Sequence, residues 1–160
     1  MKTLLVTILC FLSFSCVKTH EVDVLIIGGG ASGTTAGIQA ARLGAHTLII
    51  EEYTWLGGML TAAGVSAIDG NHKLPSGLWG EFREKLIAYY GHEDNLRTGW
   101  VSKVLFEPSV GNEIWKKLAA EEKNLDIWYQ SSYETVRRDQ GYWIVEGKKK
   151  MFLSGSKRKY

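Results

Sequence analysis

A glycine-rich turn between two apolar runs constrains this chain more than any other feature. Residues 22–27 are apolar except for one acid, and three glycines follow in the spacing G-x-G-x-x-G: Gly28, Gly30 and Gly33. In a strand–turn–helix unit the first glycine permits the tight turn and the second lets the backbone approach a pyrophosphate. The third lets the helix pack closely on the strand. The spacing therefore predicts a dinucleotide-binding βαβ unit.

The residues after the glycines favour the same unit. A helix beginning at Ala31 and Ser32 would present free N–H groups and its positive dipole end to a phosphate. Small side chains along this helix let it lie close to a sheet, and Gly44 is expected to end it in a left-handed conformation. The run "AHTLII" reads as the second strand. Glu51 stands at its carboxyl end, where a carboxylate can accept hydrogen bonds from an adenosine ribose.

Both FAD and NAD fit this half of a site, because it binds the AMP portion that the two cofactors share. An acid at position 51 disfavours the 2′-phosphate of NADP. FAD is favoured over NAD because the motif lies near the expected mature N-terminus. The run "WLGGMLT" also favours FAD, since Gly57 and Gly58 supply bare backbone where the chain passes close to a pyrophosphate or flavin.

Two longer stretches carry a family resemblance. The segments "WLGGMLTAAGVSAIDGNHKLPSGLWGEFREKL" and "TGWVSKVLFEPSVGN" resemble the FAD-dependent oxidoreductase family of large, often exported bacterial flavoproteins. That family is distantly similar to the flavin subunit of heterodisulfide reductases. The resemblance covers residues 22–147 and implies an α/β, Rossmann-like FAD-binding domain, with FAD as cofactor and redox chemistry on an unknown small molecule. It also implies that the backbone near Val136 meets the adenine.

Further elements are expected along the rest of this region. Residues 76–90 read as a helix that Ser76 caps, and a second helix begins near Pro108 and ends near Asn124. Apolar residues recur at helical spacing in both, and they are Leu78, Trp79, Phe82, Leu86 and Tyr89 in the first and Val110, Ile114 and Leu118 in the second. The run "LDIWYQ" reads as a strand, and a hairpin follows around residues 139–141.

The first 15 residues read as a secretory signal peptide. An apolar run follows Lys2, and Ser13 and Ser15 precede Cys16 at the positions of small residues before a cleavage site. Two interpretations stay open: Cys16 is the lipid anchor of a periplasmic or outer-membrane lipoprotein, or the chain is secreted without lipid. Since Cys10 leaves with the signal, the mature chain is expected to have no internal disulfide, no metal site and no iron–sulfur cluster.

The end of the chain departs from the family pattern. Residues 148–160 carry six Lys or Arg and no acid, whereas the net charge of the whole chain is +2, which does not point to nucleic acid. We interpret residues 16–147 as the N-terminal part of an FAD-binding domain, incomplete at its C-terminus, and residues 148–160 as a basic tail foreign to the fold. On this view a C-terminal half is absent, the chain alone is inactive, and no catalytic residue is assigned. A non-catalytic remnant and an NAD-binding Rossmann module are the alternatives.

Overall fold

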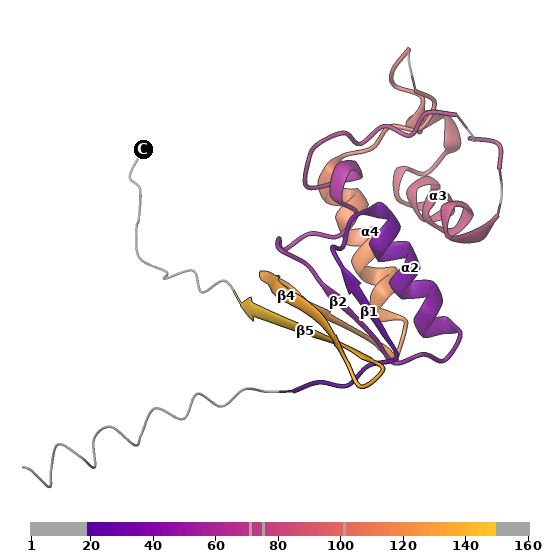
Figure 1. The fold of residues 1–160 in the computed structure, drawn as a ribbon. Coiled ribbons are helices and arrows are strands. Elements are labelled where there is room, and N and C mark those ends of the chain that lie inside the picture. Colours follow the sequence, from indigo (N-terminus) through magenta and orange to yellow (C-terminus); the bar gives the residue numbers. More distant parts are fainter. Residues whose placement is uncertain (1–18, 71, 75, 101, 150–160) are drawn as a thin grey trace, which may run out of the picture.

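The computed structural model describes residues 19–70, 72–74, 76–100 and 102–149 (Figure 1). The expected signal peptide, Cys16 and residues 150–160 of the expected tail lie outside the described residues. Within the described ranges, no helix combines the length and the apolar character that a membrane crossing requires.

The elements alternate between strands and helices in the first half and end in a hairpin. In chain order they are β1 (Val24–Ile27), α2 (Ala31–Arg42), β2 (Thr47–Ile50), η1 (Gly58–Leu60), α3 (Gly77–Tyr90), η2 (Glu93–Leu96), α4 (Pro108–Ala120), β3 (Leu125–Trp128), β4 (Ser131–Asp139) and β5 (Tyr142–Lys149). The α/β fold class and the βαβ unit expected from the glycine spacing are confirmed.

The central sheet is parallel and has the strand order β1-β2-β3. Ile50 at the end of β2 aligns with Ile27 of β1 on one side and with Trp128 of β3 on the other. Strand β2 is buried along its whole length because it has a neighbour on each side. Strand β1 is an edge strand in the described part of the chain. Ile27 is therefore 45% exposed, and the strand is less buried than its apolar sequence predicts.

Helix α2 packs on this sheet through its small residues. A Cβ on Gly37 would lie 2.6 Å from Ile49 Cδ1 in β2, so only glycine allows the observed approach. The helix ends as expected at Gly44, which has φ +94°, and the Ala45 N–H donates back to the Ala40 carbonyl. Arg42 in the last turn of α2 then forms ion pairs with Glu81 and Glu122, which hold α2 to α3 and to the turn after α4.

Helices α3 and α4 pack beside α2 and complete the hydrophobic core (Figure 1). The expected apolar stripe of α4 is confirmed, since Val110, Ile114 and Leu118 are all buried. Three details differ from expectation, at Tyr89, Asn124 and Ser76. Tyr89 is 61% exposed, and its neighbours Ile87 and Tyr90 pack on the core instead. Helix α4 ends at Ala120, and the Asn124 carbonyl accepts from the Thr47 N–H of β2. Ser76 occupies the N-cap of α3, but its hydroxyl makes no capping hydrogen bond.

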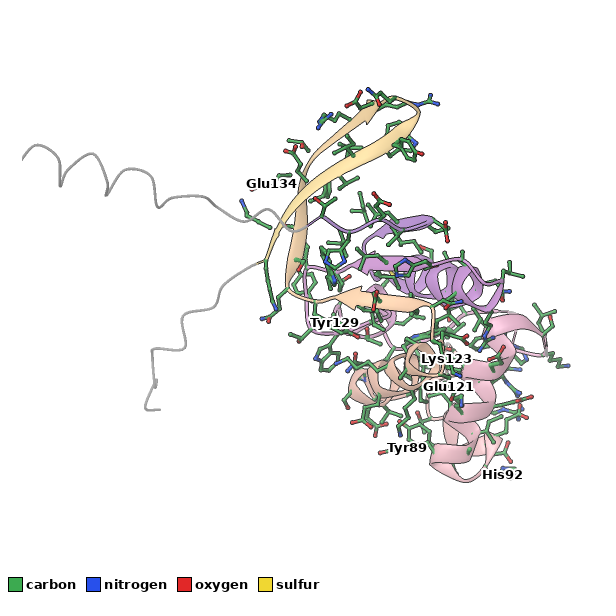
Figure 2. The ribbon with its side chains drawn as sticks, turned by 90° about the horizontal axis from the view of Figure 1, so that it is seen from below. Tyr89, His92, Glu121, Lys123, Tyr129 and Glu134 are labelled. Carbon is green, nitrogen blue, oxygen red and sulfur yellow. The ribbon has the colours of Figure 1, made fainter. Side chains whose placement is uncertain are left out.

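The hairpin β4–β5 lies on the opposite side of the sheet from α2 and α4 (Figures 1 and 2). The Ser131 N–H donates to the Glu51 carbonyl, which joins the start of β4 to the end of β2. Strand β5 continues to Lys149, which pairs with Ser131, so the hairpin runs two residues past the boundary expected at residue 147. Several of its large side chains are exposed, among them Tyr133, Val136, Tyr142 and Trp143.

The structure predicts that alanine lowers stability at one glycine of the turn and leaves it unchanged at another. A Cβ on Gly33 would lie 1.9 Å from the Gly28 carbonyl oxygen, whereas a Cβ on Gly30 would meet nothing within 4 Å. We expect Gly33→Ala to lower the free energy of unfolding by about 1–3 kcal/mol through overpacking, despite the better helix propensity of alanine. Gly30→Ala is the matched control and should leave stability unchanged in urea unfolding. Equal midpoints for the two variants would contradict this packing.

Candidate functional site

The candidate site lies at the carboxyl edge of the parallel sheet. Gly28 follows β1, Glu51 follows β2 and Tyr129 follows β3, and the register of the strands brings these three positions to the same edge. In open α/β sheets, ligands bind outside the carboxyl ends of the strands. The order of the strands therefore places the predicted site residues where such a fold binds its ligand.

The glycine turn leaves an open approach to the start of α2. Gly28 has φ +97° and its N–H donates to the Ile50 carbonyl, so the chain turns sharply while it still pairs with β2. Gly30 is the N-cap of α2, and its own carbonyl accepts from the Thr34 N–H at 2.8 Å. The N–H groups of the first helical turn, at Ala31 and Ser32, have no earlier helical carbonyl to bind. Gly30 directly precedes them, and a Cβ at Gly30 would meet nothing within 4 Å.

The peptide of Gly29 is held from three directions. Its N–H donates to Glu51 Oε2 at 2.6 Å, and its carbonyl accepts from the Gly57 N–H at 2.9 Å and from Thr34 Oγ1 at 2.8 Å. A Cβ at this position would lie 2.9 Å from Leu56 Cδ2. The conformation of the turn is thus set by β2, α2 and the segment before η1 together.

The Glu51 side chain is buried and makes hydrogen bonds within the protein that its sequence position did not indicate. Its side chain is almost fully buried, at 7% exposure, and Oε1 accepts from the Tyr53 N–H at 2.7 Å while Oε2 holds Gly29. Each carboxylate oxygen has a further lone pair, so the carboxylate retains acceptor capacity for ribose hydroxyls. The ribose role of Glu51 stays a prediction, and the structure adds a role in supporting the glycine turn.

Gly57 and Gly58 have structural reasons to be glycine. Both have positive φ, at +97° and +52°. A Cβ on Gly57 would lie 2.7 Å from Trp115 Cδ1, and a Cβ on Gly58 would lie 2.8 Å from the Gly30 Cα. The pair therefore packs directly against the turn that is expected to bind phosphate. Direct contact of either glycine with a cofactor stays a prediction.

Val136 is placed apart from the other predicted site residues. It lies in the exposed hairpin, where it pairs with Val145 of β5. The residue of β4 that contacts Glu51 is Ser131, and five residues of extended strand span about 16 Å. Figure 2 shows Glu134, two residues earlier, already on the hairpin away from the sheet. The adenine contact predicted for Val136 is not explained by these positions, and it stays a prediction.

Tyr129 belongs to the site although the motif reasoning did not select it. Burial and then the nearby Glu51 carboxylate raise the pKa of Tyr129, and Lys116 Nζ lies 5.2 Å from the centroid of its ring. Figure 2 shows Tyr129 beside the tip of β3. The signal that could have found it is its position, because it follows the third strand as Gly28 and Glu51 follow the first two.

The geometry fits the ADP portion of a dinucleotide. A Cβ on Gly30, the N-cap of α2, would meet no protein atom within 4 Å, and the helix start supplies N–H donors for phosphate oxygens. An acid stands at the carboxyl end of β2, at the distance along the chain that ribose recognition requires. Fold and site together define a Rossmann-type dinucleotide-binding domain.

Comparison with known proteins identifies the family. Residues 23–154 match the model of the family described as FAD dependent oxidoreductase. The chain belongs to that family, and FAD is its cofactor. The match continues past β5 into residues expected to be a foreign tail.

Individual relatives match this chain over short segments that make up a small part of their own length. The chain is 33% identical over 76 residues to 3-oxo-5-alpha-steroid 4-dehydrogenase of Comamonas testosteroni, covering 46% of this chain and 14% of that enzyme. It is 36% identical over 62 residues to mitochondrial glycerol-3-phosphate dehydrogenase of Saccharomyces cerevisiae, covering 39% of this chain and 10% of that enzyme. The fold resembles p-nitrophenol 4-monooxygenase PnpA of Pseudomonas putida, with TM-score 0.52 and 14% identity, over 82% of this chain and 37% of that one.

The support that Glu51 gives to the glycine turn predicts a stability effect without any ligand. In Glu51→Gln one carboxylate oxygen becomes an NH₂ group that faces the N–H of Gly29 or Tyr53, so one charge-assisted hydrogen bond is replaced by two opposed donors. We expect a loss of about 1–3 kcal/mol in the free energy of unfolding, measured by urea denaturation of the ligand-free chain. Glu113→Gln, at an exposed position of α4, is the control and should be neutral. An unchanged midpoint for Glu51→Gln would show that its carboxylate does not hold the turn.

Proposed function

We propose that this chain supplies the ADP-binding part of the FAD site in an exported oxidoreductase. The observation that carries the proposal is the glycine turn at the start of α2, in which Gly29 is held by hydrogen bonds through both its N–H and its carbonyl. A Cβ on Gly30, the N-cap of α2, would meet no protein atom within 4 Å. A glycine turn that is held by hydrogen bonds and has no side chain at Gly30 is suited to a ligand that needs close approach of the backbone. When bound, FAD supplies hydride-transfer chemistry.

The residues of the chain have distinct parts in this proposal. The N–H groups of Ala31 and Ser32, with the positive end of the α2 dipole, bind the pyrophosphate oxygens. Gly28 allows the turn, and Gly33 allows α2 to start directly against it. Glu51 holds Gly29 and accepts hydrogen bonds from the ribose. Tyr129 covers the adenosine side at the end of β3.

The residues of this chain do not identify the substrate. One relative is named for a 3-oxo steroid and another for glycerol 3-phosphate, yet both match segments of at most 76 residues. The matched segments cover 14% and 10% of these two enzymes. We therefore assign the flavin ring and the substrate to further protein, in the C-terminal half that the sequence interpretation expects. A small-molecule substrate is proposed, with no role for nucleic acid.

The proposed location is outside the cytoplasm. The apolar run and the small residues before Cys16 support cleavage of a signal peptide, and Cys16 supports lipid attachment. The first 15 residues contain no twin-arginine pair, which supports export of the unfolded chain, with the cofactor taken up afterwards. Secretion without lipid is the alternative proposal.

Binding of FAD to the full chain tests the proposed function. We expect FAD and ADP to compete for one site in isothermal titration calorimetry, because the contacts are with the ADP portion. Gly30→Val should abolish binding by filling the phosphate space, while its thermal stability stays that of the wild type, since nothing lies within 4 Å of the added Cβ. Ala36→Val adds similar bulk at an exposed position of α2 and should bind normally.

Two results would contradict this assignment. Full affinity in Gly30→Val would place the site elsewhere. Competition by NAD but not by FAD would instead support the NAD-binding module.

The N-terminus of the exported protein tests the proposed location. Mass spectrometry of the protein expressed in a bacterium should show cleavage between Ser15 and Cys16. A diacylglycerol mass on Cys16 would support the lipoprotein, and its absence would support plain secretion. Cys16→Ser should then release the protein from the membrane fraction. A product that retains Met1 would overturn export.

A further inference from the structure

The segment Leu56–Gly58 connects the glycine turn to helix α4. On one side the Gly57 N–H donates to the Gly29 carbonyl, and Gly58 packs against the Gly30 Cα. On the other side Gly57 packs against the Trp115 indole, which stacks on Phe82 in the core at a centroid distance of 4.3 Å. The short turn η1 lies beside α4 in Figure 1. A shift of this segment would therefore move Gly57 and Gly58, which contact the glycine turn directly.

The backbone of Leu56 is fully buried and receives both of its partners from side chains. Asn112 Oδ1 of α4 accepts from the Leu56 N–H at 3.0 Å, and Thr61 Oγ1 donates to the Leu56 carbonyl. Asn112 is 6% exposed and Thr61 is 1% exposed. A buried polar side chain in an otherwise apolar helix face needs such a reason, because an unpaired amide in the interior is costly.

We propose that Asn112 is a positioning residue for the cofactor site, with Thr61 as its counterpart. It acts through Leu56, whose placement determines where Gly57 and Gly58 contact the glycine turn. Without the Asn112 acceptor, the buried Leu56 N–H has to leave its position to find water. The Gly57–Gly29 hydrogen bond would then be lost and the N–H groups at the start of α2 would no longer be held ready for phosphate. This inference rests on the proposed function, because it assigns α4 to the same site.

Asn112→Leu tests the proposal, with Asn112→Asp as the conservative partner that keeps the acceptor oxygen. Hydrogen exchange of the ligand-free chain is the first measurement. In Asn112→Leu, the amides of residues 56–58 and 28–33 should exchange faster by about tenfold, in line with a lost buried hydrogen bond, while the amides of β2 keep their protection. In Asn112→Asp the same amides should stay better protected than in Asn112→Leu, because the acceptor for the Leu56 N–H is kept, although the buried carboxylate lowers overall stability. Thr61→Val removes the other partner without changing side-chain size and should reproduce the effect if Asn112→Leu fails to fold.

Affinity for ADP is the second measurement, on the full chain at a temperature where every variant is folded. Asn112→Leu should weaken binding by about tenfold. Ile114→Val is the matched control, because it lowers stability from the same helix while it leaves the Asn112–Leu56 hydrogen bond in place, and it should bind ADP as the wild type does.

Two further outcomes complete the test. Wild-type exchange at residues 56–58 and 28–33 in both Asn112→Leu and Thr61→Val would overturn the positioning role, as would an equal loss of affinity in Ile114→Val. A wild-type chain that binds neither FAD nor ADP would overturn the proposed function, while the exchange rates would still decide whether Asn112 holds the glycine turn.

Discussion

The backbone hydrogen bonds of one residue, Gly29, organise the site. Its N–H binds Glu51 at the end of β2, and its carbonyl binds Thr34 in α2 and Gly57 before η1. Because Gly29 has no side chain, Leu56 and the Glu51 carboxylate pack directly on this peptide. The turn is thus stabilised without using the N–H groups of Ala31 and Ser32, which remain available to a phosphate. The backbone groups of Gly29 are satisfied within the protein, and the N–H groups at the start of α2 are left for the ligand.

The same turn depends on parts of the chain that have no nucleotide motif. Helix α4 contributes Asn112 to the Leu56 backbone and Trp115 to the packing of Gly57. A buried N–H that loses its partner costs about 1–3 kcal/mol, which is a large part of the stability of a small domain. The precision of the turn is therefore a property of the core between α2, α3 and α4, and the glycine spacing alone does not supply it.

In the described residues, the three-stranded sheet beside the site has one central strand and two edge strands. Strand β2 is paired on both sides, whereas β1 has β2 on one side and an open edge on the other. An open edge presents unpaired N–H and carbonyl groups to other strands. This open edge explains why β1 is less buried than its apolar sequence predicts. Strand identity was predictable from composition, while burial depends on which neighbours a strand has.

The sequence by itself determined the local elements and the class of site. The spacing of Gly28, Gly30 and Gly33, the small residues of α2 and the acid after β2 are contiguous patterns, and each reflects the geometry of a few neighbouring residues. The tertiary structure alone decided which groups satisfy the buried backbone. Glu51 binds the N–H of Gly29 across 22 residues, and Asn112 binds that of Leu56 across 56. Such partners are selected by packing between elements distant in the chain, for which a local pattern has no signal. For the same reason the sequence indicated that Gly57 and Gly58 must be glycine, but not that Trp115 and Gly30 are what they contact.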